Sequence, residues 1–144
     1  MRRLCQLVVA ILLALVLGGC ASPHQSSAED VSPLSWEEAV EFTLPNSDTL
    51  TLREVEIYLR GNQRFAEDSL TVRLLLLTPD SLGYAEPFTL VIPHATPSPV
   101  AREVTIPYRS RVRFTRLGDY RLRITPTRPV KGLEAVGINI QKSK

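Results

Sequence analysis

The sequence predicts one all-β domain, a single antiparallel β-sandwich of seven or eight strands with a jelly-roll or immunoglobulin-like topology. Apolar residues recur at every second position along much of the chain, as at Val40, Phe42 and Leu44, and this is the period of a strand with one buried face. The 11 prolines are spaced among short apolar runs, and proline in a sheet is confined to edge strands, bulges and turns. From residue 34 onward, no segment keeps the 3.6-residue period of an amphipathic helix.

The chain begins with a short apolar run that ends at a cysteine. Two arginines precede the run, which extends from Leu4 to Leu17; it is too short to span a bilayer and is typical of a signal-peptide core. The residues Leu17-Gly18-Gly19-Cys20 resemble the lipobox of bacterial lipoproteins, in which the cysteine is lipidated and becomes the N-terminus. We expect residues 1–19 to be a lipoprotein signal peptide. The alternative is an ordinary cleavable signal followed by a coincidental cysteine.

Removal of this signal changes the composition of the mature chain. It takes away Arg2, Arg3 and Cys5, so the net charge of +2 for the whole sequence falls to about zero. A neutral envelope protein is a poor candidate for binding nucleic acid. Cys20 would be the one remaining cysteine, with lipid on its sulfur, so neither a disulfide nor a thiolate metal site is expected.

Residues 20–33 are expected to form the lipidated cysteine and a flexible tether, because they are rich in serine and poor in apolar residues. Ala21 and Ser22 follow the cysteine, which resembles the default sorting pattern of outer-membrane lipoproteins. We therefore expect a lipid anchor in the bacterial outer membrane, with the periplasmic face favoured over the cell surface.

The domain itself is expected to cover residues 34–144. Its strands are marked by alternating apolar residues around 40–44, 55–59, 70–77, 88–92, 104–106, 112–114, 120–124 and 136–140. In the third of these runs, Leu75 and Leu77 lie on the face opposite Leu74 and Leu76. Apolar residues on both faces predict a central strand.

The segment Leu117-Gly118-Asp119-Tyr120 resembles the tyrosine corner of β-sandwiches. In that feature the tyrosine hydroxyl bonds to the backbone upstream, where the chain passes from one sheet to the other. Gly118 would adopt the tight conformation that other residues avoid. The alternative is a plain hairpin turn followed by a half-buried tyrosine.

No catalytic, metal-binding or cofactor-binding residues are expected. His24 and His94 have no second histidine at ligand spacing, and no nucleophile or phosphate-binding motif is present. The neighbouring carboxylates Glu37-Glu38, Glu54/Glu56 and Glu67-Asp68 fit solvated faces and turns better than a glycosidase pair across a cleft. We expect a protein that is not an enzyme and has no small-molecule substrate.

Charge is distributed unevenly along the chain, with acidic residues concentrated before residue 102 and arginines after it. Arg109, Arg111 and Arg113 mark one expected strand, and Arg121 and Arg123 the next. One interpretation is a surface for an anionic lipopolysaccharide, a glycan or a protein partner. The other is that strands from the two halves interleave and their charges pair.

The two arginine rows also predict where these strands lie. In a hairpin, Arg113 would face Arg121 and Arg111 would face Arg123, and like charges directly opposite are destabilising. We therefore expect the chain to enter the other sheet at Gly118. We also expect at least one of these arginines to pair with Glu54 or Glu56.

The last third of the chain resembles a known family. Phe114, Gly118 and Tyr120 are followed by Leu133-Glu-Ala-Val136-Gly137-Ile138-Asn-Ile140, and this order resembles the closing pattern of GldH-type gliding-motility lipoproteins of the Bacteroidota. The resemblance implies a non-enzymatic component or accessory of the gliding-motility or type IX secretion envelope machinery, with other envelope proteins as partners. The rival interpretation is a module that binds glycan or anionic lipid, because a β-sandwich does not fix function.

Overall fold

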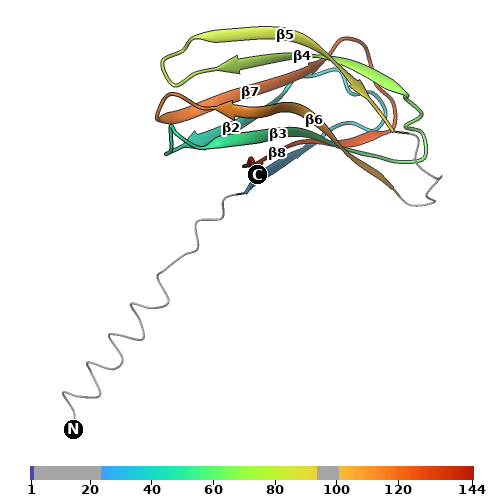
Figure 1. The fold of residues 1–144 in the computed structure, drawn as a ribbon. Helices are drawn as coiled ribbons and strands as arrows, with labels where there is room; N and C mark the ends of the chain where they lie inside the picture. The colour runs from blue at the N-terminus through green and yellow to red at the C-terminus, as the bar shows by residue number, and fades with distance from the viewer. Residues whose placement is uncertain (2–23, 94–100) are drawn as a thin grey trace.

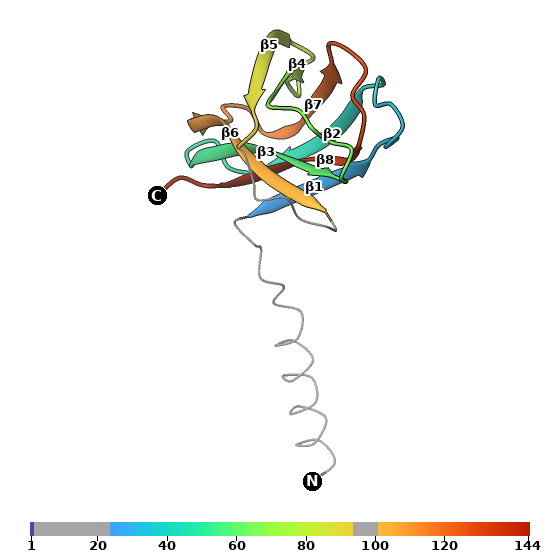
Figure 2. The same ribbon diagram turned by 90° about the vertical axis from the view of Figure 1, so that its right-hand side faces the viewer.

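The computed structural model describes Met1 and residues 24–93 and 101–144, and these form a sandwich of two antiparallel sheets (Figures 1 and 2). One sheet, here the β1 sheet, has the strand order β1-β8-β3-β6, and the other, the β2 sheet, has the order β2-β7-β4-β5. The all-β prediction is confirmed. The strands are β1 (Gln25–Asp30), β2 (Val40–Asn46), β3 (Leu52–Gly61), β4 (Ser69–Leu77), β5 (Gly83–Val91), β6 (Arg102–Arg113), β7 (Gly118–Pro126) and β8 (Leu133–Lys142).

The strand pairing identifies the topology as a jelly roll. β1 pairs with β8, β2 with β7, β3 with β6 and β4 with β5, all antiparallel. The first half of the chain is thus paired with the second half in nested order, as in a long hairpin rolled into two sheets. Of the two topologies expected from the sequence, the structure has the jelly roll.

Four prolines lie in strands, and three of them are in strands at the edge of a sheet. Pro45 is in β2, Pro87 in β5 and Pro107 in β6. Because proline has no N–H to donate, an edge position spares the sheet a missing hydrogen bond. The fourth, Pro126, is the last residue of central strand β7, so the link between proline and edge strands holds for three of the four.

The sandwich begins earlier than the sequence predicted. Gln25–Asp30, expected to belong to the flexible tether of residues 20–33, forms edge strand β1 against β8. The boundary at residue 34 is therefore wrong, and the folded domain starts at Gln25. The side chains of β1 are almost all exposed, so the strand is held by backbone pairing and lacks the apolar alternation that marks the others.

The runs at 104–106 and 112–114, expected to be separate strands, belong to one long edge strand, β6, that ends at Arg113. Its pairing with β3 shifts register between Arg53 and Glu56, and Arg111 has a φ of 54°. An irregularity of this kind bends a strand without ending it. The bend explains why the apolar alternation is interrupted between Ile106 and Val112.

The core lies between the sheets and is built from the inward side chains of the alternating runs. Phe42, Ile57, Leu74, Ile124 and Ile138 are among those with almost no exposed surface. β4 lies between β7 and β5, as its apolar residues predicted. Within the described ranges, no helix has the length and apolar character needed to cross a membrane.

The expected tyrosine corner is present between β6 and β7. The backbone N–H of Arg116 donates to the hydroxyl oxygen of buried Tyr120 at 3.0 Å, and Gly118 has a φ of 113°. The chain passes here from the β1 sheet to the β2 sheet. Both parts of the prediction, the corner and the change of sheet, are confirmed.

Candidate functional site

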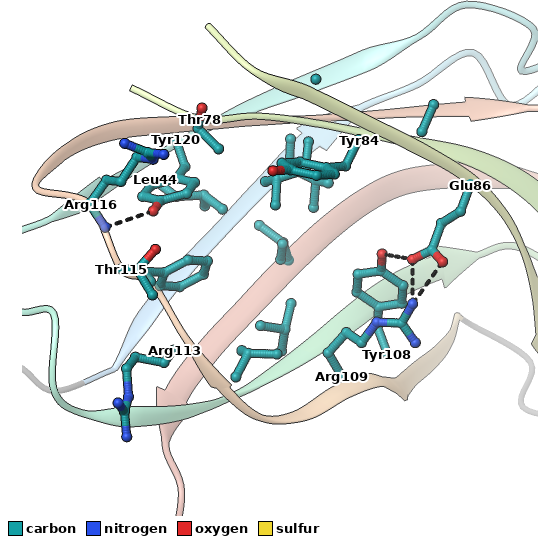
Figure 3. A pocket seen from close by; sticks show the side chains of 18 residues that line it. Leu44, Thr78, Tyr84, Glu86, Tyr108, Arg109, Arg113, Thr115, Arg116 and Tyr120 are labelled. Atoms are coloured by element: carbon teal, nitrogen blue, oxygen red, sulfur yellow. Dashed lines mark hydrogen bonds and ion pairs between the residues drawn. The ribbon is translucent and has the colours of Figure 1, made fainter. Parts of the chain in front are cut away.

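A cavity lies between the two sheets, where edge strands β5 and β6 approach the loops β4–β5 and β6–β7. Its volume is about 750 Å³, within the range of small-molecule sites. Both sheets contribute to its apolar floor, which contains Leu44, Val55, Leu122 and Ile138. Figure 3 shows polar and aromatic side chains around these residues.

One side of the cavity is closed by a contact between the two edge strands. Glu86 of β5 accepts hydrogen bonds from the hydroxyl of Tyr108 and from the guanidinium of Arg109, both in β6 (Figure 3), and the Arg109 Nη2 atom lies 2.6 and 2.7 Å from the two carboxylate oxygens. The Arg109 guanidinium also lies 4.9 Å from the centre of the Tyr108 ring. Burial and the neighbouring Glu86 carboxylate raise the pKa of Tyr108 above its usual range. Tyr108 therefore stays protonated and donates to Glu86.

The rest of the rim carries positive charge and hydroxyl groups. Arg113 and Arg116 come from the end of β6 and the loop after it, Thr78 and Thr115 lie near them, and the ring of Tyr84 lies over the cavity (Figure 3). Arg116 also pairs with Asp80 at 3.1 Å. Guanidinium groups bind carboxylate and phosphate groups through paired hydrogen bonds.

These features favour a ligand with an apolar body and an anionic group. The apolar floor would bury the apolar part of such a ligand, and the arginines of the rim would pair with its anionic group. Glu86 is the one carboxylate among the described residues that line the cavity, whereas glycoside hydrolysis uses two.

The predicted arginine surface is divided between different places. Arg109 and Arg113 line the cavity, whereas Arg121 and Arg123 lie on β7 in the other sheet. Glu41 of β2 pairs with both β7 arginines, at 2.8 Å to Arg123 and 3.8 Å to Arg121. These side chains do not form a single basic face.

The expected pairing with Glu54 or Glu56 is wrong. Among the described residues, the ion pairs of these arginines are made with Glu41 and Glu86. Glu54 instead accepts from the backbone N–H of Arg111 at 3.3 Å and from the Ser143 hydroxyl. Hydrogen bonds from the Ser143 and Ser110 hydroxyls lower the pKa of Glu54. At the bend, the backbone N–H of Arg111 therefore donates to Glu54 Oε1, and the Arg111 side chain makes no ion pair with this carboxylate among the described residues.

The broader prediction, that charges from the two halves pair across interleaved strands, agrees with the structure. The pairs Arg109–Glu86, Arg116–Asp80, Arg123–Glu41 and Arg128–Glu67 each join an arginine of the second half to an acid of the first. Nested pairing of β2 with β7 produces the Arg123–Glu41 pair, whereas Arg109–Glu86 joins edge strands of the two sheets and the other two pairs join loops.

Cys20, the expected lipidation site, and His94 lie outside the described residues. In the part of the chain that is described, no group of three or more His, Cys, Asp or Glu residues could hold a metal ion. The carboxylate pair Glu37-Glu38 lies in the β1–β2 connection, and Glu67-Asp68 lies before β4. Glu67 pairs with Arg128, which lowers the pKa of Glu67.

Sequence reasoning did not find Tyr84 or Glu86 as site residues. The expected strand began at Phe88, whereas β5 begins at Gly83 and places Tyr84, Glu86 and Phe88 on the same face as buried Leu90. The available signal was Glu86, because a carboxylate at an inward position of a strand needs a partner. Pro87 was taken as the boundary of the strand, so Glu86 was left outside it.

No protein-family model matches this chain, and no curated protein matches it in sequence. Among solved structures, an uncharacterized protein from Listeria monocytogenes EGD-e is similar over 78% of this chain and 9% of that chain, with a TM-score of 0.46 and 15% identity. A structure of the infectious bursal disease virus Gx strain is similar over 83% of this chain and 32% of that chain, with a TM-score of 0.42 and 8% identity.

Proposed function

We propose that this protein is an outer-membrane lipoprotein, anchored by lipid on Cys20, that serves as a non-enzymatic component or accessory of the gliding-motility or type IX secretion machinery. The observation that carries the proposal is the sequence Leu17-Gly18-Gly19-Cys20 at the end of a signal-peptide core. A lipid chain on this cysteine, with a second chain, gives stable membrane anchoring without a spanning helix.

Two further features support the proposal. The folded domain begins at Gln25, five residues after Cys20, so a lipid on that cysteine would hold the jelly roll close to the bilayer. The residues that resemble the GldH-type lipoproteins fall on the corner at Gly118 and Tyr120 and on β8. The periplasmic face is the side proposed for the domain.

A deletion strain tests the proposal. Loss of the gene is expected to reduce secretion of type IX cargo or the spreading of colonies, and wild-type protein should restore it. Cys20→Ala should leave the folded domain intact but move it from the membrane to the soluble fraction and fail to restore the phenotype. The role in this machinery is rejected if cargo secretion and spreading are both unchanged in the deletion strain.

A second candidate function is the binding of an anionic amphiphile or glycan in the cavity. It is favoured by the apolar floor beneath Tyr84 and the guanidinium groups of Arg113 and Arg116. Binding of a fluorescent anionic amphiphile, anilinonaphthalene sulfonate, to the folded protein tests this function. Arg113→Glu should weaken binding severalfold, whereas Arg73→Glu, a charge reversal at an exposed site on β4 outside the cavity, should not. Equal affinities for both variants would reject the cavity as the site.

A further inference from the structure

One end of the jelly roll, here the loop end, presents three exposed leucines on three different loops. The loops are residues 47–51, 78–82 and 114–117, which lie together at the left of Figure 1. Leu50 is 78% exposed, Leu82 45% and Leu117 64%. Large apolar side chains gathered at one exposed place mark a site of protein or membrane contact.

The three loops are connected to one another by hydrogen bonds and an ion pair. Asn46, buried at the end of β2, donates from Nδ2 to the carbonyl oxygens of Phe114 and Arg116 at 3.1 and 2.8 Å. Arg116 in turn pairs with Asp80 of the loop after β4 at 3.1 Å. A rigid support of this kind lets side chains enter a membrane interface without ordering a mobile loop.

The chain from the lipidation site reaches the sandwich at this same end. Gln25, the first residue of β1, donates from Nε2 to the carbonyl oxygen of Pro45 at 3.2 Å and pairs with Ile140, two residues before the end of β8. β1 then runs away from the loop end. Cys20 lies at most about 18 Å from Gln25 along the chain, so its lipid would keep the loop end near the bilayer.

The charges of the two ends differ in a direction that suits a phospholipid surface. Basic residues outnumber acidic ones at the loop end, which carries Arg53, Arg111, Arg113, Arg116, Lys142 and Lys144 against Asp48, Glu54, Asp80 and Asp119. Among the described residues of the opposite end, acidic residues outnumber basic ones, with Glu29, Asp30, Glu37, Glu38, Glu67 and Asp68 against Arg64, Arg128 and Lys131. Anionic headgroups therefore attract the loop end more than the opposite end.

We propose that the loop end is a membrane-docking surface that rests on the bilayer holding the lipid of Cys20, with Leu50, Leu82 and Leu117 inserted among the headgroups. This inference rests on the lipid anchor of the proposed function. Anchor position, exposed leucines and basic charge coincide at one end of the molecule, and each favours a phospholipid surface containing anionic lipid.

Single-cysteine labelling of the full lipidated protein tests the orientation. The sequence contains only Cys5 and Cys20, so Leu50→Cys, Leu82→Cys and Leu117→Cys each give the mature chain one free thiol. Leu34→Cys and Val91→Cys are matched controls, because these side chains are 72% and 70% exposed at the opposite end. Each variant is labelled with a nitrobenzoxadiazole probe and reconstituted in phosphatidylethanolamine–phosphatidylglycerol vesicles.

Docking predicts a blue-shifted emission and severalfold stronger quenching by lipids with brominated acyl chains at the three loop positions than at the two controls. Equal quenching at all positions in protein that floats with the vesicles overturns the docking surface and leaves the anchor standing. Wild-type protein that does not float with the vesicles overturns the anchor, and the docking surface with it.

Discussion

At the scale of single residues, two buried polar side chains define the loop end. Tyr120 was found from the sequence, because glycine two residues before a tyrosine is a recognisable pattern of a sandwich corner. Asn46 gave no such signal, although it lies buried at the end of β2 and donates hydrogen bonds to the carbonyl oxygens of Phe114 and Arg116. An asparagine is common in exposed turns, so its burial follows only from the packing of strands distant in sequence.

The corner makes a prediction about two substitutions. Tyr120→Phe removes the hydroxyl that accepts from the Arg116 N–H, and we expect a loss of about 1 kcal/mol in the free energy of unfolding. Gly118→Ala should cost more, about 1–3 kcal/mol. Its φ is 113°, and an added Cβ would lie 3.1 Å from Cβ of Pro79. Urea unfolding of the two variants checks this order, and equal, negligible changes in both would mean an unconstrained turn.

Asn46→Ala should be more damaging than either corner variant. It removes the donor to two carbonyl oxygens and the acceptor for the Arg53 guanidinium, which lies 3.0 Å from Asn46 Oδ1. Leaving buried partners unpaired costs about 1–3 kcal/mol each. A change in unfolding free energy below about 1 kcal/mol would show that water replaces these bonds.

Asp48 makes a pH-dependent contribution in the β2–β3 loop. The Thr51 hydroxyl and the backbone N–H groups of Leu50 and Thr51 donate to its carboxylate and lower its pKa from 3.8 to about 2. The unfolded chain therefore binds this proton at higher pH than the folded chain does. The stabilisation is complete above about pH 4 and is lost as the pH falls toward about 2.

Thr51→Val tests this contribution, because it removes the largest cause of the lowered pKa and keeps the carboxylate. We expect stability to fall less steeply between about pH 4 and pH 2 than in the wild type. Circular dichroism during acid titration measures the slope. An unchanged slope in this interval would contradict the assignment.

At the scale of strands, apolar alternation in the sequence was enough to predict a strand that has one buried face. It was not enough to predict the other strands. β3 and β7 were found because inward residues such as Ile57 and Leu122 alternate with polar ones. β1 has no such pattern. It pairs closely with β8 partly because Gly137 has no side chain, since a Cβ there would lie 2.7 Å from the Ser27 carbonyl oxygen. Backbone pairing of a polar edge strand leaves no apolar alternation in the sequence.

The pairing of β2 with β7 can be tested through Glu41, which lies directly opposite Arg123. Glu41→Gln should cost at most about 1 kcal/mol, because exposed ion pairs contribute little. Glu41→Arg sets like charges opposite each other and should destabilise further. Thermal unfolding at low and high salt measures both, and the difference between the variants should shrink in salt. Equal stability of Glu41→Arg and wild type at low salt would contradict the register.

At the scale of the whole molecule, the fold brings acidic residues of the first half of the chain beside arginines of the second half. They meet as ion pairs such as Arg128–Glu67, so uneven charge along the sequence did not by itself place the arginines on one basic face. The cavity could not be found in the same way. It depends on how edge strands β5 and β6 approach the loops β4–β5 and β6–β7, which no local pattern records.

The central claim is that Cys20 anchors this jelly roll to a membrane. The mass of the intact protein, extracted from native membranes and measured by mass spectrometry, tests the claim most directly. We predict a chain that begins at Cys20 and carries the added mass of a lipidated N-terminus. A chain that retains residues 1–19, or that begins elsewhere without lipid, would contradict the claim.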